Sequence, residues 1–191
     1  SNRVCLYYMR RFFSTCLLVL VGICFAGGAY LLLTATAPIV APIVTLRQPM
    51  QPPTTAAAAM LYIPKINVEI PFARGDASTL ETGAWWRQPA SGNPADGGNF
   101  VLAAHRFQMG WTPARTARQS PLYHIDKLAV GDDITVDYEH TRYAYRITEL
   151  YRVPPTAGEI EAATDDARLT LYSCTLGGAS DGREVIIARK K

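Results

Sequence analysis

The longest apolar run in the chain begins at Phe12 and ends at Leu33, and residues 12–46 contain no acidic or basic side chain. A helix needs about 20 mainly apolar residues to cross the hydrocarbon core of a membrane. We therefore predict a transmembrane helix over residues 12–34. A secretory signal peptide is the alternative, although its apolar region is usually only about 7–15 residues long before a cleavage site of small residues, such as those at 35–37.

The charges on either side of this run indicate its orientation. Arg3, Arg10 and Arg11 precede it, and Arg47 is the only basic residue that follows soon after. Lys and Arg are in excess on the cytoplasmic side of membrane helices. We therefore expect residues 1–11 to be cytoplasmic and the chain beyond the helix to lie outside the cell membrane.

Residues 35–59 are rich in proline, with Pro38, Pro42, Pro49, Pro52 and Pro53 among them. Proline interrupts helices and favours extended backbone. The segment is predicted to be a linker between the membrane helix and a domain that begins at residue 60. The alternative is that part of it packs on that domain.

From residue 60 onward the pattern changes to short apolar or alternating runs, which Gly and Pro clusters separate. This is typical of strands joined by turns. The runs are 61–63, 68–72, 100–104, 134–138, 143–152, 169–174 and 185–188. Two further segments, 79–86 and 121–128, are predicted to be short helices. The pattern thus indicates that residues 60–191 form an all-β barrel or sandwich.

The formal net charge of +3 is unevenly distributed. Residues up to 59 carry four basic side chains and no acid, whereas residues from 60 onward carry 15 basic and 16 acidic side chains. A nucleic-acid-binding domain needs a basic patch on its folded surface. The balance therefore argues against nucleic acid as a partner.

The cysteines also divide between the two parts of the chain. Cys5, Cys16 and Cys24 lie in or beside the apolar run, and Cys174 is the only cysteine after residue 59. Outside the cell, cysteines of small domains normally form disulfides. A single one indicates a reactive thiol or a thiol that pairs with another molecule.

Cys174 ends a segment in which apolar and polar residues alternate. A period of two places Thr170, Tyr172 and Cys174 on one face of a strand. Arg183 opens the next strand after a loop over residues 175–182. If the two strands pair antiparallel, the guanidinium lies near the thiol. A buried core cysteine with a surface arginine is the alternative interpretation.

His105 stands at the end of the hydrophobic strand predicted over residues 100–104. A histidine in that position can face a cleft and transfer protons, but a single histidine is more often structural. His140 is expected at a hairpin tip in solvent. His124 is expected to cap or pack the short segment 121–128.

Metal sites have only weak support in the sequence. Zinc spacings such as Cys-x-x-Cys or His-x-x-x-His are absent, so no zinc site is predicted. Acidic residues cluster before the strand of Cys174, at Glu159, Glu161, Asp165 and Asp166. Their oxygen ligands suit calcium, and a solvated acidic loop is the other interpretation.

Several motifs together resemble those of the sortase family. The Thr-Leu-Tyr-Ser-Cys run at 170–174 is similar to the family's Thr-Leu-x-Thr-Cys signature. Arg183, nine residues after the cysteine, and the Ala-Ala-His-Arg segment at 103–106 match the other two landmarks in order and spacing. Residues 62–68 resemble the family's first strand. The resemblance covers residues 60–189.

This resemblance implies a closed eight-stranded barrel with short helices and a cysteine transpeptidase activity. It implies Cys174 as nucleophile, His105 as acid and base, and Arg183 as the charge that stabilises the reacting carbonyl. Thr170 and Ser173 are the implied substrate-binding residues. No cofactor is implied, and calcium stays an alternative.

The implied substrates are secreted proteins with a C-terminal Leu-Pro-x-Thr-Gly-like (LPxTG-like) sorting signal, and the implied acceptor is an amine of peptidoglycan or of a pilin. Pilus-building members of the family often carry an Asp-Pro-aromatic plug before the domain and a second membrane helix at the C-terminus. Residues 38–60 contain no Asp and the chain stops at Lys191, so we expect a general anchoring subclass such as A, D or E. The alternatives are a cysteine hydrolase, a pilin-polymerising sortase and a non-catalytic tethered scaffold.

Overall fold

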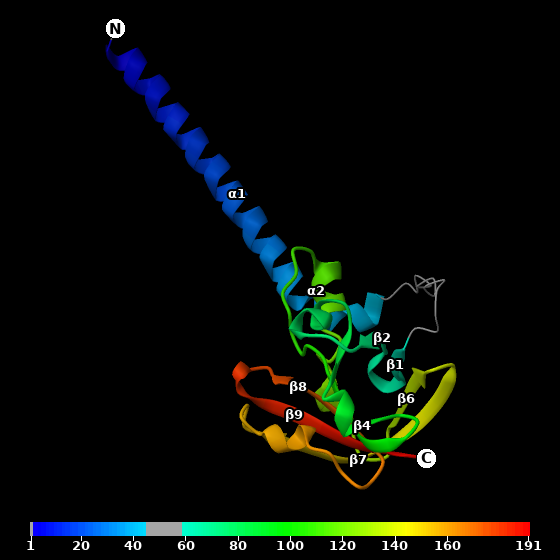
Figure 1. The fold of residues 1–191 in the computed structure, drawn as a ribbon. Coiled ribbons are helices and arrows are strands. Elements are labelled where there is room, and N and C mark those ends of the chain that lie inside the picture. The colour runs from blue at the N-terminus through cyan, green and yellow to red at the C-terminus, as the bar shows by residue number, and fades with distance from the viewer. Residues whose placement is uncertain (1, 45–58) are drawn as a thin grey trace.

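A computed structural model describes residues 2–44 and 59–191 of the chain (Figure 1). A long helix, α1 (Asn2–Val44), extends away from a β-rich domain that begins at Met60. The strands of this domain are β1 (Met60–Ile63), β2 (Val68–Ala73), β3 (Ala84–Arg87), β4 (Gly92–Asn93), β5 (Gly97–Ala103), β6 (Asp133–Tyr138), β7 (Thr141–Val153), β8 (Arg168–Thr175) and β9 (Gly178–Lys190). The helical elements that join them are η1 (Pro64–Ile66), η2 (Ala77–Glu81), η3 (Pro89–Ser91), α2 (Pro113–Gln119), η4 (Ile125–Lys127) and η5 (Gly158–Glu161).

Eight of the strands close into a barrel. Their hydrogen-bonded order is β3-β2-β1-β6-β7-β9-β8-β5, and β3 also pairs with β5, which joins the two ends of the sheet. The two-residue strand β4 is added at the start of β5. The pairs β2–β3 and β5–β8 are parallel, and the other pairs are antiparallel. The predicted closed eight-stranded barrel is confirmed.

Apolar side chains fill the barrel interior. The ring of Phe100 on β5 packs against those of Phe72 and Trp86, with ring centroids 5.4 and 5.2 Å away, and these two rings also contact each other. Leu169 on β8 belongs to the same buried cluster. Burial of a side chain of this size contributes roughly 1.5–3 kcal/mol, so this cluster is a major source of the domain's stability.

Alternate residues of β9 face opposite sides of the sheet, as the period of two requires. Ile186 and Ala188 lie in the barrel interior. Val185 and Ile187 lie in a second apolar cluster outside the barrel, together with Ile160 of η5. The connection between β7 and β8 therefore covers the outer face of β9.

The predicted helix over residues 79–86 is wrong in its second half. The helical turn η2 ends at Glu81, and the strand β3 that follows closes the barrel against β5. Between them, a Cβ on Gly83 would stand 2.1 Å from the carbonyl oxygen of Pro71. No side chain fits there, and the close approach brings β3 alongside β2.

Two other short helices also differ from expectation. The predicted helix over 121–128 is reduced to the single turn η4. The helix α2, which the pattern did not predict, begins after Thr112, whose side chain accepts a hydrogen bond from the backbone N–H of Arg115 (3.2 Å). A Thr cap followed by Pro113 is a normal helix start.

Helix α1 continues past the predicted end of the span at residue 34. It includes Pro38 and Pro42 and ends at Val44. The prediction of an extended linker is therefore wrong for residues 35–44, and residues 45–58 lie outside the described residues. Within the described chain, one helix is long and apolar enough to cross a membrane, over Arg10–Val40.

The end of α1 packs directly on the β domain. Thr34 and Pro38 are buried, and α1 lies against α2. Pro42 has no N–H to donate to the carbonyl of Pro38, four residues earlier. The ring nitrogen Nε2 of His124 lies 3.1 Å from that carbonyl oxygen and takes the missing partner's place. The alternative expectation, that part of the segment packs on the domain, is what the structure shows.

Candidate functional site

Cys174 and Arg183 face each other across the hairpin of β8 and β9. They are direct partners in the antiparallel register, so the predicted pairing is confirmed. The predicted loop over 175–182 is shorter than expected, because β9 already begins at Gly178 and pairs there with Thr175. The register shifts between Cys174 and Thr175, and this bulge lies directly beside the thiol.

The parallel strand β5 brings His105 to the other side of Cys174. Ala103 is opposite Tyr172, and the backbone N–H of Ala104 donates to the carbonyl oxygen of Tyr172 (3.2 Å). His105 lies two residues after Ala103, and Cys174 lies two residues after Tyr172, the partner of Ala103. The same register therefore places the histidine beside the cysteine.

Arg183 on β9, Cys174 on β8 and His105 just beyond the end of β5 thus form a row, because these three strands are consecutive in the sheet. Leu171 and Ile186 point into the barrel. Cys174 is three residues after Leu171, and Arg183 is three residues before Ile186. Because successive side chains of a strand alternate between its two faces, Cys174 and Arg183 face the outer side. The residue before His105 is also in the barrel interior, which gives the histidine the same outward direction.

His105 is partly buried, and this burial lowers its pKa below the ordinary value of 6.5. The carboxylate of Glu81, with Oε1 4.0 Å from Nε2, opposes the shift. Gln119 in turn donates to the other oxygen of Glu81. The imidazole is therefore mainly neutral at pH 7, and a neutral imidazole can accept a proton from a thiol.

The thiol of Cys174 is free and partly exposed. Arg183 donates from Nη1 to the carbonyl oxygens of Ala179 (2.8 Å) and Gly182 (3.0 Å). These bonds hold the guanidinium against the hairpin turn. Within the described residues, its Nε and Nη2 make no hydrogen bond, so these donors are available to a ligand.

The two residues predicted to bind substrate lie in buried positions. Thr170 is fully buried and donates to Oδ1 of Asn99 (2.6 Å). Ser173 is also buried and donates to the carbonyl oxygen of Cys174 (3.0 Å). Both hydroxyls therefore bond to the protein itself, and the structure places neither at a surface where a ligand would reach it.

Sequence reasoning missed an ionic network on the outer face of β8. Glu161 accepts hydrogen bonds from Nε of Arg87 (2.8 Å) and from the hydroxyl of Tyr172, two residues before Cys174. Burial alone would raise the pKa of Glu161, but these bonds outweigh it and hold the pKa below 4.5. Arg87 also stacks on the ring of Trp85 at 3.9 Å. The network fixes η5 beside the site.

The calcium alternative gains no support from this arrangement. Glu161 is engaged with Arg87, and Asp166 is paired with Arg189. Over the residues described, no three His, Cys, Asp or Glu side chains gather as a metal site would require.

A second feature that sequence reasoning missed is a buried ion pair on the inner side of the sheet, behind the row of Arg183, Cys174 and His105. Arg106, only 3% exposed, follows His105 and contacts the carboxylates of Glu184 and Asp126. Glu184 follows Arg183 and is also buried. The sequence did contain a signal for this ion pair, because Arg106 directly follows His105 and Glu184 directly follows Arg183.

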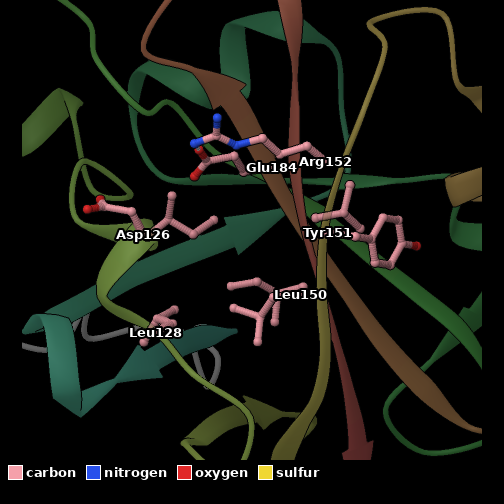
Figure 2. A pocket seen from close by; sticks show the side chains of 9 residues that line it. Asp126, Leu128, Leu150, Tyr151, Arg152 and Glu184 are labelled. Atoms are coloured by element: carbon pink, nitrogen blue, oxygen red, sulfur yellow. Dashed lines mark hydrogen bonds and ion pairs between the residues drawn. The ribbon is translucent and has the colours of Figure 1, made fainter.

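Glu184 also lines a cavity of about 310 Å³ between η4, β7 and β9. Figure 2 shows Arg152 against Glu184, Asp126 on the η4 side, and Leu128 and Leu150 toward the apolar end. The residues of the Cys174 row are not among those that line it. The cavity is therefore separate from the thiol.

A family model described as "Sortase domain" matches residues 61–191. Sortase SrtE1 of Streptomyces coelicolor is 31% identical over 102 residues, which are 50% of this chain and 26% of that protein. The chain therefore spans about a quarter of the length of this relative.

Solved structures of sortases share the fold. A Sortase D5 transpeptidase of Clostridium perfringens matches with a TM-score of 0.59 and 24% identity, over 72% of this chain and 81% of that one. Sortase A of Corynebacterium diphtheriae matches with a TM-score of 0.59 and 21% identity, over 70% and 60%. A C. perfringens sortase C solved with its C-terminal cell wall sorting motif matches with a TM-score of 0.58 and 24% identity, over 69% of each chain. Because the family model spans more than half of the residues and the barrel is the one these structures share, the chain belongs to the sortase family of cysteine transpeptidases.

Proposed function

We propose that this protein is a membrane-anchored transpeptidase that cleaves a C-terminal LPxTG-like sorting signal and transfers the acyl group to an amine of the cell wall or of a surface protein. The observation that carries the proposal is the row formed by Arg183 on β9, Cys174 on β8 and His105 two residues after the end of β5. A free thiol between a guanidinium and a neutral imidazole is the arrangement that acyl transfer through a thioester needs.

In the first step, His105 takes the proton of the Cys174 thiol, and the sulfur attacks the carbonyl carbon between Thr and Gly of the signal. Arg183 donates hydrogen bonds to the oxyanion that forms, from the nitrogens that do not bond to the turn carbonyls. His105 then gives its proton to the departing Gly amine. The products are a thioester on Cys174 and the released C-terminal peptide.

In the second step, an acceptor amine attacks the thioester. His105 removes a proton from the attacking nitrogen and returns it to the Cys174 sulfur as this leaves. A peptidoglycan amine or a lysine of a pilin is a suitable nucleophile because each supplies a primary amine. The proposed steps need neither a redox partner nor a metal ion.

The anchoring part of the proposal rests on α1. Arg10 and Arg11 precede its apolar stretch, and Thr34 and Pro38 at its other end pack on the β domain. By the excess of positive charge, the N-terminus faces the cytoplasm and the barrel faces outward. The enzyme would then meet secreted substrates on the outer side of the membrane.

The experiment that tests this function offers the full chain, in detergent, a set of sorting peptides and a glycine-terminated amine acceptor. Wild type is expected to give a thioester adduct on Cys174, seen by mass spectrometry, and then the ligated product. Cys174→Ala is expected to give neither, whereas Cys16→Ala in α1 is expected to keep both. Ligation by Cys174→Ala would disprove the assignment, and release to water alone would identify a hydrolase instead.

A further inference from the structure

A short exposed apolar segment follows directly after His105. Phe107, Met109 and Trp111 are 41%, 46% and 85% exposed. Contiguous exposed apolar side chains on a soluble surface usually mark a contact with a protein or a membrane. Because the segment includes one of the most exposed large apolar side chains of the domain, it is a candidate contact surface.

Hydrogen bonds to α2 and to the residue that follows it hold the segment in one conformation. The N–H of Gln108 donates to Oγ of Ser120 (3.0 Å), and the N–H of Gly110 donates to Oγ1 of Thr116 (3.0 Å). A Cβ on Gly110 would come within 2.9 Å of Arg115, so the backbone lies close against α2. The ring of Phe107 packs edge-on against Tyr123, and the side chains of Met109 and Trp111 are exposed at the surface of this fixed backbone.

The segment also contacts α1 at a defined level. The hydroxyl of Tyr30 donates to the carbonyl oxygen of Trp111 (2.6 Å). Thr34, one turn further along α1, is buried against the domain. Trp111 therefore lies at the level of Tyr30 along the helix axis.

Helix length places Tyr30 at the outer boundary of the bilayer. The hydrocarbon core is about 30 Å thick, which corresponds to about 20 residues at 1.5 Å per residue. Counted from Arg11, the last basic residue before the apolar run, this thickness is crossed close to Tyr30. Tyr and Trp are enriched at this boundary because their rings combine an apolar body with a polar group.

The charges around the segment suit a lipid surface. Residues 107–125 contain no acidic side chain. Arg115 and Arg118 on α2 are exposed. Basic side chains near an anionic membrane surface are attracted to the lipid headgroups.

We propose that Phe107, Met109 and Trp111 insert into the outer interface of the same bilayer that α1 spans, while Arg115 and Arg118 face the lipid headgroups. This inference rests on the membrane anchoring in the proposed function. Insertion fixes the backbone only two residues after His105. The bilayer surface would therefore hold one wall of the site in place.

The test uses the full chain reconstituted in phosphatidylcholine–phosphatidylglycerol vesicles that contain lipids brominated near the headgroup end of the acyl chain. Bromine quenches only tryptophans at that depth. Among the three tryptophans, Trp86 is buried in the barrel and Trp85 is covered by Arg87. Quenching is expected in wild type and in Trp85→Phe, and its loss is expected in Trp111→Phe.

A second measurement separates the inference from the anchoring. Cys16 and Cys24 lie within α1 and are expected to be protected from a water-soluble maleimide in the same vesicles. Protected cysteines without quenching that depends on Trp111 would overturn the insertion and leave the anchor intact. Labelling of Cys16 and Cys24 would overturn the anchor and the insertion together. Circular dichroism checks that Trp111→Phe retains the wild-type fold.

Discussion

Arg106 and Glu184 form a buried ion pair, and each directly follows one member of the row, His105 and Arg183. In the register of the hairpin, Glu184 is also opposite Ser173, the residue before Cys174. The pair therefore joins the end of β5 to β9 on the inner side of the sheet, directly behind the outward-facing row. A shift of either strand would separate two buried charges.

Glu184→Gln is expected to destabilise the domain strongly, because the guanidinium of Arg106 would stay buried with one carboxylate fewer. Loss of one partner of a buried pair costs about 3–5 kcal/mol; the contact with Asp126 favours the lower end. The measurement is urea unfolding of the full chain. Asp137→Asn, which removes the exposed pair with Arg142, is the control and should cost less than about 1 kcal/mol. Equal losses in both variants would contradict the role of the buried pair.

Arg183→Lys is expected to lower kcat/KM for peptide transfer by about 10²–10³-fold, which is the usual cost of losing an oxyanion donor. Lysine keeps the charge but has no planar fork, so it cannot bind the turn carbonyls and the substrate together. Arg189→Lys, at the other end of β9, is the matched control and should retain activity. Near-normal turnover by the Arg183→Lys enzyme would remove Arg183 from the mechanism.

Glu81→Gln is expected to move the acid limb of the kcat/KM profile to lower pH. Burial lowers the pKa of His105 and the Glu81 carboxylate opposes that effect, so removal of the negative charge lowers the pKa further. Activity that needs neutral His105 is lost as the pH falls through this pKa, and the loss would therefore begin at a lower pH. Glu69→Gln on β2 serves as the control. A limb that moves to higher pH would show that another group determines it.

Glu161→Gln is expected to cost about 1–3 kcal/mol at pH 7, because Arg87 loses its partly buried ionic partner. The pKa of Glu161 is held below 4.5 in the folded protein, so its contribution is present above that pH and is lost as the pH falls through the folded pKa. The difference in thermal unfolding between wild type and variant should thus shrink in acid. Exposed Glu159→Gln should show no such difference at either pH. A constant difference would mean that the charge of Glu161 plays no part.

Alternation along the strands was enough to predict most of the barrel. The β8 segment shows it clearly, and the Cys174–Arg183 pairing followed from one hairpin, which is a local relationship. The position of His105 beside Cys174 depends on a parallel pair between β5 and β8, strands separated by more than 60 residues. Local patterns carry no register for such a pair, so only the family resemblance could place it.

The elements that were missed depend on contacts outside their own segment. The local sequence of β3 favours a helix, but the segment forms a strand because it pairs with both β2 and β5 and so closes the barrel. The burial of Thr170 and the partial burial of Glu161 follow from η5, whose packing on β8 the acidic sequence does not reveal. The helix through Pro38 was missed because its freed carbonyl has a partner, His124, that is distant in sequence.

The contact between Pro38 and His124 has a consequence for the choice of substrate. In the proposed function, α1 is an anchor that packs on its own domain, and it would hold Cys174 at a nearly constant height above the lipid, since each residue of helix adds a fixed 1.5 Å. A sorting signal that is itself tethered to the membrane must present its scissile bond at that height. The number of residues between the signal and the substrate's own membrane segment would then govern cleavage, independently of the signal's sequence.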